Sequence, residues 1–590
     1  MYVLGINSGH HSTAALLKDG KIIGCVSEER FKRIKNYSGY PQESINYLLK
    51  EAGIQSQELD LVALGYRTPP PFVTVEKKGI QILSALQRFV YSLRYLWGAV
   101  EYRLPFLRPL NEFLYDLMVD IAGPCIIRRE KSLISKLLKI SPDRVLDVDH
   151  HTAHAYAAYY GSNFNNTQAL VFTLDGEGDK LCATVNIYDG ARIQRIAATH
   201  LGHSIGWIYM DTTQFLGMKP NEHEYKVMGL APYAKSWGVD KVYDIIKDII
   251  DLNRKNPLIF RSKFDTHRTI PYFEKTLRFQ RFDFIAGAVQ RLTEDVVTRW
   301  IKAAIQKTGI SKIALGGGVF MNVKANMKIM EMPQVQDIYI FPSCGDESTP
   351  IGACFYGYKY LCEQGKIKFS PQPIKDLYLG PEFSDQEIGE ALNRGKIFDK
   401  YTVKKIDDIE TEIARLLSEN QIVARVNGRM EWGARALGNR SILANPSDYE
   451  NIRVLNEWVK DRDFWMPFTP TILKEREKDY VVNPKGISTP YMILTFRTKE
   501  LARKHLKAAI HPYDFTARVQ ALEESWNPGF YKTIKEFERL TGIGGVLNTS
   551  FNLHGEPMVC SPEDALKTME NSELKFLALG NFLISKERSK

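Results

Sequence analysis

The sharpest chemical signal in the sequence is HHTAH, residues 150–154, which is followed by the alanine- and tyrosine-rich run AYAAYY. That composition predicts a helix, and His150 and His154 are four residues apart, so both lie on one face of it. Two imidazoles on one face can bind the same metal ion but leave its coordination incomplete. Asp175 and Asp346 are candidates for the oxygen ligands, because each follows an apolar strand and lies in a polar loop.

This donor set of two imidazoles and two carboxylates suits Fe(II), Zn²⁺ or Mn²⁺. The alternative is that the histidines cap the helix or pack as neutral side chains. An isolated pair of histidines at this spacing favours that alternative. The polar loops that carry the two aspartates favour a metal site.

A glycine run offers a second chemistry. Gly316, Gly317 and Gly318 follow the short strand SKIAL and precede a helical stretch that starts at Asn322. A glycine turn at the start of a helix lets backbone N–H groups approach a phosphate closely. We therefore predict that these three glycines and Asn322 contact a nucleotide.

Basic and amide residues form short clusters in the last third of the chain. Guanidinium groups bind phosphate in a planar fork and lysine acts as a point charge, so several such groups in one place would hold a small phosphorylated anion. The alternative is surface salt bridging, which the glycine-bracketed segment around Arg435 makes less favoured. The candidates are Arg435 in GRMEWGARALGNRS, Lys460 and Arg462 in KDRD, Arg518 in TARVQ and Asn548 in NTSFN.

The elements around these residues repeat. YVLGIN (2–7) reads as a buried strand, followed by a polar loop and two strands joined at Asp19-Gly20, a strong hairpin signal. The same order of strand, glycine-bearing loop and hairpin recurs over 169–198. Two such units predict a duplicated α/β domain with a phosphate in the cleft between its loops. With the glycine run, this order resembles the actin, sugar-kinase and Hsp70 ATPase superfold.

Two segments interrupt this plan. Residues 66–145 mix aromatic and basic residues and read as several inserted helices, which either pack onto the domain or form a lid or docking surface for an acceptor or a membrane. Residues 363–376, EQGKIKFSPQPIKD, read as a boundary. We expect domains over 1–365 and 366–590, the second with strands at 421–426 and 492–496 and a helix over 408–420.

Length and composition fit this division. A chain of 590 residues is too long for one core, and a net charge of +9 fits phosphate handling, weak nucleic-acid affinity or a merely basic surface. Seven scattered cysteines without a CxxC pair predict free thiols in a reducing compartment. The sequence shows neither a secretory signal nor a run that could span a bilayer, so we expect a cytoplasmic protein.

Ten motifs in order resemble the NodU/CmcH family of O-carbamoyltransferases, over nearly the whole chain. The family includes enzymes that carbamoylate nodulation factors, cephalosporins and tobramycin. The motifs are GHHSTAALLKDG, HHTAHA, LDGEGD, KVMGLAPY, GGGVFMN, GDESTPIGA, GRMEWGARALGNRSILANP, VKDRDFWMPFTP, TARVQ and NTSFNLHGEPMV.

The resemblance implies a two-step reaction. A YrdC-like C-terminal domain would convert carbamoyl phosphate and ATP, with Mg²⁺, to carbamoyl-adenylate. An N-terminal domain similar to the tRNA threonylcarbamoyl-transfer ATPases would then transfer the carbamoyl group to a hydroxyl of a small natural-product or sugar-like acceptor. The implied metal ligands are His150, His154, Asp175 and Asp346, and the implied general base is His10.

The basic clusters take their roles from the same resemblance. Lys460 and Arg518 would act in adenylate formation, and Arg435, Arg462 and Asn548 would hold phosphate and nucleotide. Three positions depart from the family pattern: His11 replaces aspartate, Met466 replaces arginine and Ala434 replaces proline.

Two alternatives share these folds. A tRNA-modifying threonylcarbamoyltransferase would explain the positive charge and would bind tRNA tightly with a steep salt dependence. A non-catalytic ATP-binding sensor would show no exchange of pyrophosphate into ATP. We expect no stable nucleic-acid partner, and the sequence leaves a homodimer open.

Overall fold

A computed structural model describes residues 1–68, 107–164 and 166–586. Contacts divide the chain into two compact units, which are described separately. Unit 1 comprises Met1–Glu28 and Asn36–Ile374, and unit 2 comprises Glu29–Lys35 and Lys375–Lys590. The short stretch Glu29–Lys35, which contains helix α1 (Glu29–Lys32), thus belongs to unit 2 although both of its neighbours in sequence belong to unit 1.

The first sheet of unit 1 has the strand order β3-β2-β1-β4-β5. Its first three strands form an antiparallel meander, and the last two run parallel to β1. The hairpin predicted at Asp19-Gly20 connects β2 to β3. The strands are β1 (Tyr2–Asn7), β2 (Thr13–Lys18), β3 (Lys21–Ser27), β4 (Leu61–Leu64) and β5 (Val145–Asp147).

The second sheet repeats this topology, in the order β12-β11-β6-β7-β8. Here β6, β7 and β8 form the meander, while β11 and β12 run parallel to β6. The predicted duplication of architecture is therefore confirmed by the strand order. The strands are β6 (Ala169–Gly178), β7 (Leu181–Tyr188), β8 (Ile193–His200), β11 (Lys312–Gly316) and β12 (Asp337–Ile340).

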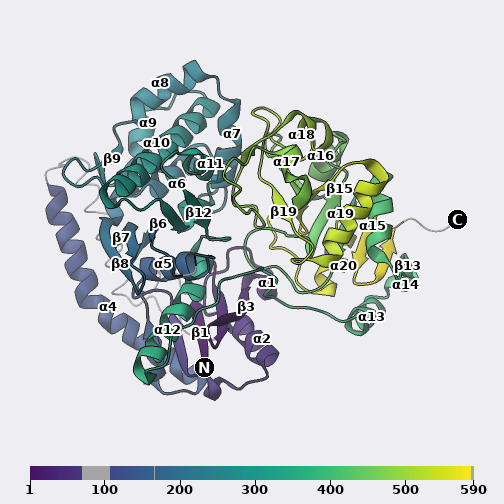
Figure 1. The fold of residues 1–590 in the computed structure, drawn as a ribbon, viewed down its shortest axis with the longest axis horizontal. Coiled ribbons are helices and arrows are strands. Elements are labelled where there is room, and N and C mark those ends of the chain that lie inside the picture. Colours follow the sequence, from purple (N-terminus) through teal and green to yellow (C-terminus); the bar gives the residue numbers. More distant parts are fainter. Residues whose placement is uncertain (69–106, 165, 587–590) are drawn as a thin grey trace. The chain divides into compact units, whose positions relative to one another are not determined.

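One helix packs on each of these sheets, and the two helices pack against each other (Figure 1). Helix α12 (Thr349–Gly365) packs on β1, β2 and β4, and α5 (His150–Tyr160) packs on β6 and β11 and also on α12. The ends of α5, β6 and α12 therefore meet in one region. The other helices are α2 (Gln42–Ala52), α6 (Ile205–Phe215), α7 (Glu224–Leu230), α8 (Ser236–Ile246), α9 (Thr269–Thr276), α10 (Phe282–Thr308) and α11 (Val323–Glu331); β9 (Ile250–Leu252) and β10 (Phe260–Ser262) form a separate two-stranded sheet.

The predicted insertion falls between β4 and β5, and its residues 69–106 lie outside the described residues. The described part holds one helix of 31 residues, α4 (Arg108–Leu138), where several helices were predicted. The C-terminal end of α4 contributes Ile134 and Leu138 to a buried core cluster that includes β1 and β4. Among the described helices, none is both long and apolar enough to cross a bilayer.

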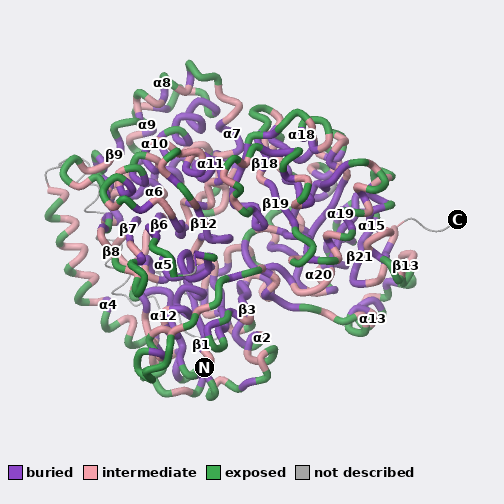
Figure 2. The backbone as a smooth tube through the Cα atoms, in the orientation of Figure 1, coloured by how far each residue is buried: buried purple, intermediate pink, exposed green. Residues whose placement is uncertain are grey.

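Unit 2 is built on an eight-stranded mixed sheet in the order β13-β22-β21-β14-β15-β20-β16-β19. Its strands are β13 (Thr402–Lys405), β14 (Val423–Val426), β15 (Arg440–Ala444), β16 (Thr469–Leu473), β19 (Gln520–Leu522), β20 (Gly545–Ser550), β21 (Phe576–Leu579) and β22 (Phe582–Ser585). The helices of at least six residues are α13 (Asp385–Arg394), α15 (Ile409–Ser418), α16 (Glu450–Leu455), α18 (Glu500–His505), α19 (Pro528–Thr541) and α20 (Pro562–Glu570). Figure 2 shows the sheet as largely buried backbone.

The strand predicted at 421–426 and the helix predicted over 408–420 are present as β14 and α15. The strand predicted at 492–496 is wrong. Met492 has a φ of 56°, in the left-handed region, and only Phe496–Arg497 form a two-residue strand, β17, with β18 (Thr516–Ala517). Residues 492–496 are buried, so this apolar run is mostly a loop that packs in the core.

Candidate metal centre and anion-binding residues

Helix α5 presents the two predicted imidazoles from successive turns. The helix begins after Asp149, whose carboxylate accepts the Thr152 N–H at 2.8 Å and so caps it. The Nε2 atoms of His150 and His154 are 3.1 Å apart. Spacing and cap together therefore aim both rings at one point.

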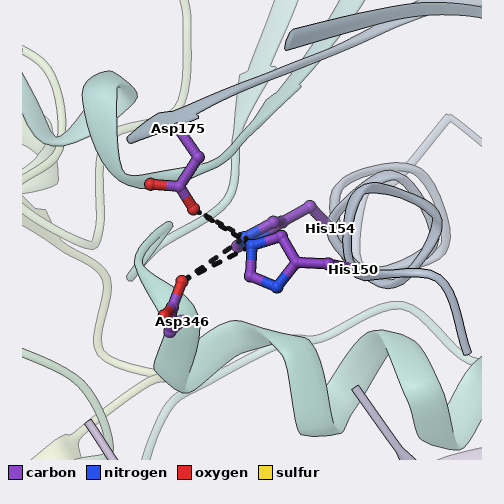
Figure 3. A group of neighbouring side chains, drawn as sticks. All are labelled: His150, His154, Asp175 and Asp346. Carbon is purple, nitrogen blue, oxygen red and sulfur yellow. Dashed lines mark hydrogen bonds and ion pairs between the residues drawn. The ribbon is translucent and has the colours of Figure 1, made fainter. Parts of the chain in front are cut away.

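The structure brings the two predicted aspartates to the same point (Figure 3). Asp175 lies within β6 rather than in the loop predicted for it, and its Oδ2 lies 3.3 Å from His150 Nε2 and 3.1 Å from His154 Nε2. Asp346 Oδ1 lies 3.6 Å and 3.9 Å from the same nitrogens. One ligand atom from each of the four residues falls within 4.8 Å of the others, which fits a single metal ion.

Neighbouring residues fix these side chains. The hydroxyl of Ser348 lies 3.0 Å from His154 Nδ1, which leaves Nε2 for the centre. Gly178 makes room for the other ring, since a Cβ there would lie 2.1 Å from Cδ2 of His150. His151 points elsewhere: its Nδ1 lies 2.7 Å from the Thr173 hydroxyl, so the middle histidine of the run is structural.

The electrostatics of this cluster favour a cation. Burial alone would lower the pKa of His150, but Asp175 and Asp346 outweigh burial and raise that pKa to about 9. Burial and the nearby Asp175 raise the pKa of Asp346 to about 7. Although burial opposes it, hydrogen bonds from the two histidines hold the pKa of Asp175 well below its usual range. Two carboxylates this close need a shared positive charge, which protons or a divalent ion can supply.

The glycine run packs directly against the metal residues. Gly317 has a φ of 99°, and a Cβ there would lie 2.4 Å from the carbonyl oxygen of Leu174. At Gly318 a Cβ would lie 2.9 Å from Asp175 Oδ1, and at Gly316 it would lie 2.9 Å from the His154 carbonyl oxygen. These close approaches explain the glycines structurally, and their contact with a nucleotide stays a prediction.

Asn322 also has structural partners. Its side-chain oxygen caps α11 by accepting the Ala325 N–H at 3.0 Å, and its Nδ2 donates to Gln290 Oε1 at 2.9 Å. The helix start predicted at this residue is correct. Its role toward a nucleotide stays a prediction.

In unit 2, the predicted basic residues lie close enough to affect one another. Burial, and then Arg435 and Arg462, hold the pKa of Arg518 well below its usual range. Burial, and then Arg462, do the same to the pKa of Lys460. The buried Nε of Arg518 has no hydrogen-bond partner among the described residues. Converging positive charges of this kind are the electrostatic condition for binding an anion.

Lys460 is oriented by the segment that follows β20. Its ammonium donates to the Ser550 carbonyl oxygen, to Asn552 Oδ1 at 2.7 Å and to the Asn552 carbonyl oxygen at 3.1 Å. Three acceptors hold the ammonium in place although it is almost fully buried.

Comparison with known sequences identifies the family. Residues 2–355 match the family model described as Carbamoyltransferase N-terminus, and residues 414–586 match the one described as Carbamoyltransferase C-terminus. The chain belongs to the carbamoyltransferase family. The four residues of the metal cluster all lie in its N-terminal region, and the basic residues of unit 2 lie in its C-terminal region.

Two relatives match nearly the whole of this chain. The protein sll1178 of Synechocystis sp. is 32% identical over 99% of this chain and 97% of its own. The nodulation protein NolNO of Sinorhizobium fredii is 29% identical over 98% of this chain and 79% of its own. Among solved structures, HypF of T. kodakarensis is 13% identical with a TM-score of 0.34, covering 62% of this chain and 49% of that one. The protein is accordingly an enzyme, a carbamoyltransferase.

The opening loop of this carbamoyltransferase lies beside the metal cluster. Asn7 donates from Nδ2 to the carbonyl oxygens of His10, at 2.8 Å, and of Asp346, at 3.3 Å. His11 Nδ1 lies 3.3 Å from Glu347 Oε2, so this histidine has a carboxylate partner next to the candidate ligand Asp346. Burial, and then His11, lower the pKa of His10 to about 3, which keeps its ring unprotonated at neutral pH.

Several of these supporting residues were missed by sequence reasoning. Asn7 flanks a recognised motif, and Glu347 and Ser348 lie inside another, but the partners that give them a role come from distant parts of the chain. Their place in or next to GHHS and GDES was the one signal available for them.

Asn548, predicted to bind nucleotide, is nearly fully buried on β20. Its Nδ2 donates to the Ala436 carbonyl oxygen at 3.2 Å and lies 3.0 Å from the Thr471 hydroxyl, while Oδ1 has no partner among the described residues. The amide thus fixes the residue next to Arg435. Contact between Asn548 and a nucleotide stays a prediction.

Proposed function

We propose that the protein is an ATP-dependent O-carbamoyltransferase with two chemical sites. Unit 2 would convert carbamoyl phosphate, water and ATP to carbamoyl-adenylate, phosphate and pyrophosphate. Unit 1 would transfer the carbamoyl group to a hydroxyl of a small natural-product or sugar-like acceptor. The observation that carries this proposal is the convergence of the ligand atoms of His150, His154, Asp175 and Asp346 within 4.8 Å of one another.

The four-residue cluster fits a divalent transition ion such as Fe(II), because two imidazoles and two carboxylates form a suitable donor set. A bound ion would supply Lewis-acid polarisation of the carbamoyl carbonyl. The ligand side chains hold their geometry through Ser348 and Gly178. His10 is the candidate to accept the proton of the acceptor hydroxyl, and its pKa of about 3 makes it a weak base until a nearby charge raises that pKa.

Unit 2 would bind the phosphates. The positive charges of Lys460 and Arg518 would pair with the bound phosphate, which would relieve the repulsion among the basic side chains. Arg435 and Arg462 would add hydrogen-bond donors to the phosphate. ATP would enter with Mg²⁺. Adenylation makes chemical sense, because carbamoyl phosphate acylates a neutral alcohol slowly and AMP is a stabilised leaving group.

Two assays test this function separately. Incorporation of labelled pyrophosphate into ATP, dependent on carbamoyl phosphate, reports adenylate formation. Mass spectrometry of hydroxylated candidate acceptors for a gain of one CONH unit reports transfer. A metal-loaded enzyme that shows no exchange with carbamoyl phosphate would refute the adenylate route, and the family membership would still stand.

A further inference from the structure

Helix α4 turns its charged face toward the protein. Arg108, at the start of the helix, donates to the carbonyl oxygens of Gly202 at 2.8 Å and Ser262 at 2.9 Å. One turn later Glu112 accepts from Arg108 Nε at 2.8 Å. Glu112 also lies 3.8 Å from His203 Nε2.

The same face continues along the helix in steps of four residues. Asp116 Oδ1 lies 3.4 Å from His200 Nε2, and Asp120 accepts from Lys180 at 2.6 Å. The fourth acidic residue of the helix, Glu130, is buried and accepts from Tyr66. Each acidic side chain of α4 therefore lies close to a basic, histidine or tyrosine side chain of unit 1.

The apolar face of α4 is turned outward. Leu110, Phe113, Leu117 and Ile121 are 49%, 61%, 44% and 68% exposed, and their spacing of three or four residues places them in one stripe. Figure 2 shows the first half of the helix as exposed and intermediate turns at the edge of unit 1. Monomeric proteins in water seldom leave a continuous apolar stripe uncovered, so it indicates a binding surface.

Basic residues follow this stripe along the helix. Arg128, Arg129 and Lys136, all of which come after Ile121, are exposed. The exposed surface of α4 thus combines an apolar stripe with positive charge, and its one exposed acid, Asp120, is ion-paired. This combination is that of helices that lie in the interface of anionic bilayers. Such helices do not cross the membrane, in accord with the absence of a spanning helix among the described residues.

We propose that the outward face of α4 docks on the surface of a bilayer that contains anionic lipids. Leu110, Phe113, Leu117 and Ile121 would enter the boundary between headgroups and acyl chains, and the arginines would pair with lipid phosphates. The proposal goes beyond carbamoyl transfer and does not depend on it. If it holds, unit 1 works at a membrane surface, where an amphiphilic acceptor would be concentrated.

The first test is flotation of the full-length protein with vesicles. The protein should float with equimolar phosphatidylcholine–phosphatidylglycerol vesicles and remain at the bottom with phosphatidylcholine alone. Raising the salt concentration should weaken binding, because salt screens the arginines from the lipid phosphates. Absence of flotation with the anionic vesicles at low salt would overturn the proposal.

Variants locate the surface. Phe113→Ser combined with Ile121→Ser should lower the vesicle partition coefficient by at least about tenfold, because two large apolar side chains are lost. The matched control is Phe279→Ser combined with Trp237→Ser, which removes exposed aromatic residues elsewhere in unit 1 and should leave binding unchanged. Equal loss in both double variants would place the binding surface elsewhere and overturn the proposal.

Cys125 provides a direct probe, because it lies on the exposed side of α4 and the other six cysteines are buried. A polarity-sensitive dye on Cys125 should react readily without vesicles, shift to the blue with anionic vesicles and be quenched by spin-labelled lipid. A thiol protected without vesicles would show that another part of the chain or a second copy covers the stripe. Light scattering would then separate these two outcomes, and either would overturn the proposal.

Discussion

The phenol of Tyr66 donates a 2.6 Å hydrogen bond to the buried carboxylate of Glu130, and the Ser8 hydroxyl lies 3.1 Å from the same oxygen. Tyr66 follows β4, Glu130 lies on α4 and Ser8 lies in the loop after β1. One carboxylate thus ties the insertion to the loop that carries His10.

Tyr66→Phe should lower the free energy of unfolding of unit 1 by about 1–3 kcal/mol, because it removes a donor from a buried carboxylate. Urea denaturation followed by tryptophan fluorescence measures this. Tyr40→Phe is the matched control, since the Tyr40 hydroxyl is buried without a hydrogen-bond partner among the described residues. Equal effects in the two variants would show that the Glu130 contact contributes nothing.

His150→Ala combined with His154→Ala should abolish metal binding and carbamoyl transfer but leave pyrophosphate exchange intact, because the cluster lies in unit 1 and the basic residues lie in unit 2. Elemental analysis and the two assays measure this. His505→Ala, in unit 2, serves as control and should keep the metal. Full metal content in the double variant would remove the basis of the proposed site.

Ser348→Ala should weaken metal binding by about 10–100-fold, because the Ser348 hydroxyl fixes the orientation of the His154 ring. Titration of metal-free protein with a competing chelator measures the affinity. Ser348→Thr keeps a hydroxyl and should recover part of the loss. Unchanged affinity in Ser348→Ala would mean that burial alone orients the ring.

Lys460→Met and Arg518→Met should each lose pyrophosphate exchange, with about 2 kcal/mol or more lost per charged contact. Both side chains keep most of their length, so packing is retained. Lys532→Met is the control, because Lys532 is exposed and pairs with Asp408 at 2.8 Å. Retained exchange in both test variants would place the anion elsewhere.

Asp211→Asn should raise the free energy of unfolding, and this gain should grow as pH rises. Burial raises the pKa of Asp211 to about 7, although His267 and two backbone N–H groups oppose it. A carboxyl with a raised pKa in the folded state contributes stability at low pH, which is lost as pH rises from about 4 to about 7. Asparagine cannot ionise, so the variant avoids this loss.

The expected gain in free energy of unfolding is about 1–4 kcal/mol at about pH 8 and near zero at about pH 4. Urea denaturation at the two pH values measures it. A gain that is the same at both would show that ionisation of Asp211 is not its cause.

The sequence singled out the four residues whose side chains the structure brings together. HHTAH indicated its own helix, and Asp175 and Asp346 followed strands whose ends meet in a duplicated α/β domain. Local periodicity carries this information, because a four-residue spacing means one face only on a helix. Metal binding by these four residues stays a prediction, which the closeness of their ligand atoms makes testable.

Contacts between distant loops could not be predicted in the same way. Ser348 reaches His154 across 194 positions, and no local pattern encodes that approach. The glycine run was interpreted through phosphate binding, whereas the structure adds a packing reason in Leu174 and Asp175. For α4, composition indicated aromatic and basic residues but not that the charged face points inward.

The insertion also cannot be excised as one piece. Removing residues 77–140 would delete Ile134 and Leu138 from the core as well as Glu130. Changes to acceptor choice are therefore better sought in the exposed half of α4, where substitutions spare the core.

The stretch 29–35 limits how this chain can be divided into fragments. Arg30 donates to the Gly433 carbonyl oxygen at 2.9 Å, and Arg33 donates to those of Met558 at 2.7 Å and Pro557 at 2.9 Å. A fragment that starts at residue 375 would leave these carbonyls without their donors, and the complementary fragment would carry two orphaned arginines. No single cut separates the two units, so recombination or gene fission at their boundary would damage both halves at once.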